Sequence, residues 1–123
     1  MRELKFRAWD NDFKQMGLVN DAKFVNGRII GAKGVNWDSK VIVMQFTGLT
    51  DKNGKEIYEG DIMKKDYLSI DPNLKIAVFH NGSFGYYPNN RSLEDNFKTF
   101  SASVNWNSFE VIGNIYSNPN LLK

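Results

Sequence analysis

Apolar and polar residues alternate along several short runs of this chain, and turn residues separate the runs. Successive side chains of a β-strand point to opposite faces, so alternation over such short lengths predicts strands rather than helices. The runs that we expect to form strands are 4–9, 24–30, 41–46, 74–80 and 109–116. The run 41–46 (VIVMQF) is apolar on both faces as far as Gln45, which predicts a central strand covered on both sides.

Asn-Gly pairs mark three of the expected turns, at 26–27, 53–54 and 81–82. Each pair lies between apolar or β-branched residues. Asn-Gly is the preferred pair of a two-residue hairpin turn, because both of its central positions need positive φ. The sequence therefore predicts three hairpins.

Other local signals complete the pattern. Gly60-Asp61 precedes the apolar pair Ile62-Met63 and predicts a corner of the backbone, while Gly113 predicts a bend or a close approach. Ser92 is followed by acidic residues, so one short helix is expected over 92–97. At least six short strands with tight turns predict a mainly β fold: a small bent-sheet or β-barrel-like domain built from hairpins, with one or two short helices.

The chain has 123 residues, which is close to the most common domain size, so we expect a single domain over 1–123. Hydrophobic residues make up 41% of the sequence and charged residues 24%, as is typical of a folded protein. The C-terminal tail, 116–123, contains Leu121 and Leu122. We expect these two leucines to dock on the same domain or on a neighbouring copy.

Charge and motif content argue against several classes of function. The net charge of +2 is too small to indicate a protein that binds nucleic acid by neutralising many phosphates. There is no cysteine, so disulfides, thiolate metal sites and a cysteine nucleophile are excluded. None of the 10 glycines falls in a phosphate-binding pattern, and no cofactor is expected. No apolar run is long enough to span a membrane and no secretory signal is visible, which predicts a cytoplasmic protein without membrane contact.

His80 is the only histidine and therefore the first candidate for a general base. Glu59 and Asp61 flank Gly60 and could act as paired carboxylates, but no familiar nucleophile motif surrounds any serine. A small hydrolase is a remote alternative that requires these three groups to converge in one pocket. The segment 51–56 (DKNGKE) lacks the ligand spacing of a calcium loop, so a hairpin is the better interpretation and no metal site is predicted.

Aromatic residues make up 14% of the chain and interleave with arginine in two places. Phe6 and Trp9 flank Arg7, and Tyr86 lies shortly before Arg91. Bases stack on exposed rings at about 1–3 kcal/mol each while arginine binds phosphate, so the pattern suits a groove for single-stranded nucleic acid. Packing in the core or at a protein interface explains the same residues, and we favour that interpretation.

Three segments in order resemble the YopX family of small, uncharacterised phage and prophage proteins. FTGLTDKNGKEIYEGDI at 46–62 resembles the characteristic stretch of that family, FRAWD at 6–10 its opening and VIGNIYSNPNLL at 111–122 its close. The resemblance implies a phage-derived protein of a bacterial host cell, with a compact fold of β-barrel character. It further implies self-association, and it brings no established activity.

The combined expectation is a non-enzymatic β-domain that self-associates and binds another macromolecule, with protein favoured over nucleic acid as the partner. A module that binds single-stranded nucleic acid is the alternative, and the hydrolase is the remote one. The candidate binding or interface residues are Phe6, Arg7, Trp9, Tyr58, Glu59, Asp61, Tyr86, Arg91, Leu121 and Leu122.

Overall fold

The structure, a computed structural model, describes residues 4–26, 28–32, 41–65, 74–100 and 109–122. These residues form two five-stranded antiparallel sheets. The first sheet has the order β3-β2-β1-β4-β5. Its strands are β1 (Phe6–Asp10), β2 (Gln15–Val25), β3 (Arg28–Ala32), β4 (Val41–Thr50) and β5 (Glu56–Tyr58).

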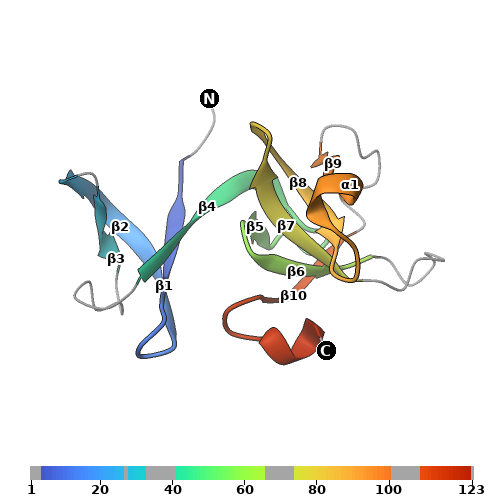
Figure 1. Cartoon of the computed structure of the whole chain (residues 1–123). Helices are drawn as coiled ribbons and strands as arrows, with labels where there is room; N and C mark the ends of the chain where they lie inside the picture. The colour runs from blue at the N-terminus through green and yellow to red at the C-terminus, as the bar shows by residue number, and fades with distance from the viewer. Residues whose placement is uncertain (1–3, 27, 33–40, 66–73, 101–108, 123) are drawn as a thin grey trace.

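The second sheet has the order β10-β6-β7-β8-β9 and curls around a core. Its strands are β6 (Asp61–Lys64), β7 (Lys75–His80), β8 (Ser83–Pro88), β9 (Lys98–Thr99) and β10 (Glu110–Asn114). Figure 1 shows β1, β2 and β3 on one side of the molecule and the second sheet on the other, with the long strand β4 running between them. The predicted fold class, mainly β with a bent, barrel-like sheet, is confirmed.

Two short helical segments accompany the strands: α1 (Leu93–Asn96) and the 3-10 helix η3 (Pro119–Leu122). The predicted helix start at Ser92 is confirmed, but its hydroxyl does not cap the backbone. It donates instead to Asp95 Oδ2 at 3.1 Å. Among the described residues, no helix is long and apolar enough to cross a membrane.

The hairpin turn predicted at Asn81-Gly82 is confirmed. His80 pairs with Ser83 across the turn, and the two central residues have φ of 51° and 80°. Positive φ at both positions matches the right-handed twist of the two strands, which is why Asn-Gly is preferred there. At the first hairpin, Val25 pairs with Arg28 and Asn26 also has positive φ.

The two-residue turn predicted at Asn53-Gly54 is wrong. Of these two residues only Gly54 has positive φ, at 82°. The loop is longer than two residues, since the hydrogen bond that closes it runs from the amide of Asp51 to the carbonyl of Lys55, at 2.7 Å. The cause is the Asp51 side chain, whose Oδ1 accepts from the amides of Asn53 at 2.8 Å and Lys55 at 2.9 Å. These bonds favour a three-residue loop that ends in a left-handed glycine.

The prediction that 41–46 is covered on both faces is also wrong. β4 is central in strand order, between β1 and β5, yet Val43 is 37% exposed while its neighbour Met44 is 3% exposed. A β-branched side chain is favourable on a strand even when its face is open to water. An apolar run therefore did not require burial on both sides.

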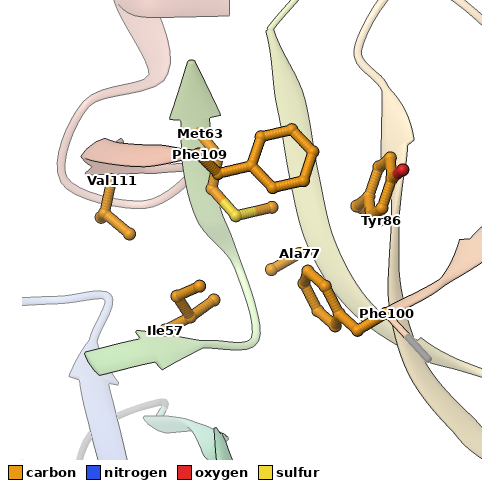
Figure 2. Close-up of a cluster of buried hydrophobic side chains, with 7 residues drawn as sticks. All are labelled: Ile57, Met63, Ala77, Tyr86, Phe100, Phe109 and Val111. Atoms are coloured by element: carbon orange, nitrogen blue, oxygen red, sulfur yellow. The ribbon is translucent and has the colours of Figure 1, made fainter. Parts of the chain in front are cut away.

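The core lies inside the curl of the second sheet (Figure 2). The buried side chains that form it are Ile57, Met63, Ala77, Tyr86, Phe100, Phe109 and Val111. The ring of Tyr86 packs edge-on against Phe109, with centroids 4.9 Å apart. Figure 2 shows the Tyr86 hydroxyl pointing away from the cluster. Tyr86 therefore contributes its ring to the core and carries its polar end out of it.

Candidate functional site

The segment 58–61 connects the two sheets. We call this segment, together with Arg7, the sheet junction. Gly60 has φ of 86°, and this turns the chain from β5 into β6. The amide of Gly60 donates to the carbonyl of Ala77 at 2.8 Å, and its carbonyl accepts from the amide of Ile115 at 2.9 Å. The predicted corner is therefore confirmed, and it is hydrogen-bonded to β7 and to the residue that follows β10.

Arg7 and Asp61 form a buried ion pair in this junction. Arg7 Nη2 donates to Asp61 Oδ1 at 2.8 Å and to the Glu59 carbonyl at 3.1 Å. Asp61 Oδ2 accepts from the amide of Tyr58 at 2.8 Å, and the guanidinium lies 4.8 Å from the centre of the Tyr58 ring. The two partners are 54 positions apart in the sequence, so this contact joins β1 to the start of β6.

Burial dominates the electrostatics of this pair. The side chains of Arg7 and Asp61 are 11% and 2% exposed. Burial raises the pKa of the Asp61 carboxyl above its ordinary value, while the guanidinium of Arg7 and the Tyr58 amide act in the opposite direction. A buried pair of this kind contributes little net stability, but it is sensitive to the loss of either partner.

Glu59 and His80 do not join Asp61 in one pocket. Glu59 Oε1 accepts from the amide of Gln45 at 2.8 Å, so both carboxylates around Gly60 are hydrogen-bonded to the backbone. His80 lies three residues beyond Ala77, which contacts the corner, and thus roughly 10 Å further along β7. Its ring packs edge-on against Phe97, with centroids 5.1 Å apart. The convergence that a hydrolase would need is not seen for these three groups.

Trp9 is buried at the same junction, beside the C-terminal segment. Its ring stacks on Tyr116 with centroids 6.2 Å apart and an angle of 27°. Burial and the nearby Glu59 carboxylate raise the pKa of Tyr116. Phe6, at the start of β1, is half-buried. Arg7 thus joins the first sheet to β6 through the carboxylate of Asp61, and Trp9 joins it to the segment after β10.

The C-terminal tail contacts its own molecule. Asn118 Oδ1 accepts from the amide of Asn114 at 3.2 Å. Gly113, expected to allow a close approach, does so: a Cβ there would lie 2.7 Å from Asn118 Oδ1 and 2.9 Å from Leu121 Cδ1. Leu121 remains 36% exposed and Leu122 is half-buried.

A cavity of about 320 Å³ lies between the second sheet and α1. We call it the basic cavity, because the described residues around it include four cationic side chains and one carboxylate. Its lining residues are Lys65, Lys75, Tyr86, Pro88, Arg91, Asp95, Asn96, Phe97 and Lys98. The structure thus brings together Tyr86 and Arg91, the second aromatic and basic pair of the sequence.

Sequence reasoning missed the lysines of this cavity. One signal was present, since the alternation of 74–80 places Lys75 on the same face as the core residue Ala77. The pairing of Tyr86 with Lys98 comes from β9, a two-residue strand that has no recognisable pattern of its own. Lys65 directly follows β6, so only the fold reveals the cluster.

Solved structures share this architecture over the whole chain. The crystal structure of protein EF1440 from Enterococcus faecalis matches with a TM-score of 0.64 and 30% sequence identity, and covers 100% of each chain. The crystal structure of protein yopX from Bacillus subtilis matches with a TM-score of 0.58 and 20% identity, over 97% of this chain and 98% of that one. No curated protein matches. The model of the YopX protein family matches residues 5–123, so the chain belongs to the YopX family.

Proposed function

We propose that this chain is a non-enzymatic, self-associating binding protein of a phage or prophage, which acts in the bacterial cytoplasm on another macromolecule, most readily a protein. The hydrogen-bonded carboxylates of the sheet junction support a structural role for the family-like segment. The observation that carries the proposal is the exposed leucine Leu18 on the first sheet.

Leu18 lies on a face of the first sheet on which Arg7 and Met44 are buried. Arg7 pairs with Met44 on one side and with Leu18 on the other, so these side chains share one face of the sheet. The second sheet and the C-terminal segment cover Arg7 and Trp9, whereas Leu18 is 56% exposed. Leu18 thus extends a buried apolar face into water, beside the edge strand β3. A second copy of the chain is the occupant we propose for it.

Light scattering after size exclusion, at micromolar concentration, tests the assembly. Leu18→Lys should lower the mass, because a cation would be placed in the contact. Val43→Lys is the matched control, since Val43 is an exposed apolar residue on the opposite face of the same sheet. A strictly monomeric native protein, or equal effects of both substitutions, would contradict the proposal.

Binding of single-stranded nucleic acid is the second candidate, and the joint position of Tyr86 and Arg91 in the basic cavity favours it. A salt-sensitive gel shift that weakens with Arg91→Ala would support this function. Arg7, in contrast, is held by Asp61 and is not expected to contact phosphate. No shift at low salt with single- or double-stranded nucleic acid would remove the second candidate.

A further inference from the structure

The basic cavity concentrates positive charge in a protein that is nearly neutral overall. The whole chain carries a net charge of +2, yet four cationic side chains meet around this one cavity: Lys65, Lys75, Arg91 and Lys98. Lys65 directly follows β6, Lys75 begins β7, Arg91 lies in the segment after β8, and Lys98 is in β9, so the fold and not a run of basic sequence gathers them. A cavity walled by one sign of charge attracts counter-ions strongly.

Little negative charge opposes these cations. Among the residues that the structure describes, Asp95 is the only carboxylate of the lining, and its Oδ2 accepts a hydrogen bond from Ser92 Oγ. Lys65, Arg91 and Lys98 form no ion pair with any other residue that the structure describes. Three cations with free donors can therefore bind an anion from solution. Lys75, which is 3% exposed, adds a further ammonium from the inner face of the sheet.

One wall of the cavity is aromatic and firmly positioned. Phe97 packs over Gly85, where a Cβ would lie 2.6 Å from its ring, and it also contacts the ring of His80. Because glycine leaves this space, the ring of Phe97 can lie close to β8. The cavity therefore combines a flat apolar surface with cationic groups.

The size of the cavity limits the ligand. A volume of about 320 Å³ is near the lower end of the range for small-molecule pockets, which is about 300–1,000 Å³. It suits one compact unit rather than a long stretch of polymer. Phosphate is an anion that both arginine and lysine bind, and aromatic rings stack on the flat bases that accompany it in nucleotides.

We propose that the basic cavity binds a phosphate group attached to a flat ring, in the form of a nucleotide that is either free or part of a single strand. Arg91, Lys98 and Lys65 hold the phosphate, and the ring lies against Phe97. This site does not depend on self-association, since none of its residues belongs to the uncovered face around Leu18.

Fluorescence anisotropy with a labelled oligothymidylate tests the strand, and competition with adenosine monophosphate or inorganic phosphate tests the free ligands. Arg91→Gln and Lys98→Gln should each weaken binding at least about tenfold, because a charge-assisted hydrogen bond is lost. Lys52→Gln is the matched control, because Lys52 is an exposed lysine outside the cavity. Phe97→Leu should weaken the nucleotide more than inorganic phosphate.

The outcomes separate the two sources of the ligand. If adenosine monophosphate displaces the oligonucleotide, the ligand is a free nucleotide. If the oligonucleotide binds and adenosine monophosphate does not displace it, the ligand is a strand. Equal affinity for phosphate and nucleotide, with no effect of Phe97→Leu, would overturn the aromatic part of the proposal. Absence of binding by all three probes, or equal loss in Lys52→Gln and Arg91→Gln, would overturn the site. The melting temperature of each variant verifies that it is folded.

Discussion

Replacing Asp61 by asparagine removes one charge from the sheet junction with almost no change in size. In the native protein, the two carboxylate oxygens accept hydrogen bonds of 2.8 Å each, one from Arg7 and one from the Tyr58 amide. An asparagine side chain has only one acceptor oxygen, so its NH₂ group must face one of these donors. The variant therefore loses a hydrogen bond as well as the partner of a buried cation.

The magnitude follows from how deeply the pair is buried. With side chains 11% and 2% exposed, little water is available to replace the lost carboxylate around Arg7. Removing one partner of a buried ion pair typically costs about 3–5 kcal/mol. Domains are commonly stable by only about 5–15 kcal/mol. We therefore expect Asp61→Asn to lose a large share of the free energy of unfolding.

Urea unfolding, followed by the fluorescence of Trp9 and the other tryptophans, measures this loss. Glu110→Gln is the matched control, because Glu110 pairs with Lys52 at 3.9 Å with both side chains more than a third exposed. An exposed pair of this kind contributes about 0–1 kcal/mol. If Asp61→Asn were no less stable than Glu110→Gln, the buried pair would not hold the junction together.

A double variant separates charge pairing from packing. Methionine at position 7 keeps much of the length of the arginine side chain and removes its charge, so Arg7→Met with Asp61→Asn should recover part of the stability that Asp61→Asn loses. The two changes are in direct contact and should be strongly non-additive. Losses that simply add would contradict the assignment of the effect to the ion pair.

Three further variants test other features of the structure. Arg7→Met leaves Asp61 buried without its cation, which raises the pKa of that carboxyl further. The stability of this variant, measured by urea unfolding, should therefore fall as the pH rises from about 4 to 7. A stability that does not change with pH would contradict this. Burial alone would raise the pKa of Asp51, but the amides of Val111, Lys55 and Asn53 hold that pKa below its ordinary value. The ionised Asp51 carboxylate therefore stabilises the protein above about pH 4, and this effect is lost as the pH falls further. Asp51→Asn should lower the free energy of unfolding by about 1–3 kcal/mol at pH 7 and by less in acid. Equal losses at both pH values would refute the reasoning. Gly85→Ala would place a Cβ 2.2 Å from the Lys98 carbonyl oxygen, and a loss of about 1–3 kcal/mol in thermal melts is expected, with an unchanged melting temperature as the contrary result.

Local chemistry made part of this fold predictable. The turn at Asn81-Gly82 follows directly from two residues that tolerate positive φ, and the structure contains it. The same dipeptide at 53–54 forms a different loop, because the carboxylate of Asp51 accepts two backbone amides and selects another turn. A side chain two residues away was thus enough to change the result.

The functional regions depended on contacts that no local pattern contains. Nothing around Arg7 indicates that its guanidinium meets Asp61, because the two residues are 54 positions apart and meet only when the sheets pack. The basic cavity likewise combines Lys75, Arg91 and Lys98 from different segments. Alternation predicts the face of a strand on which each residue lies. It does not predict which distant segment covers that face.

The position of β4 has a consequence for how the protein unfolds. β4 pairs with β1 along its first half and with β5 further on, so its backbone is common to both groups of strands (Figure 1). Removal of either group would leave β4 with a row of unpaired backbone groups, and such a remnant is not stable in water. The two groups should therefore melt as one cooperative unit. A force applied to either end of the chain would therefore have to unfold both groups of strands in one step.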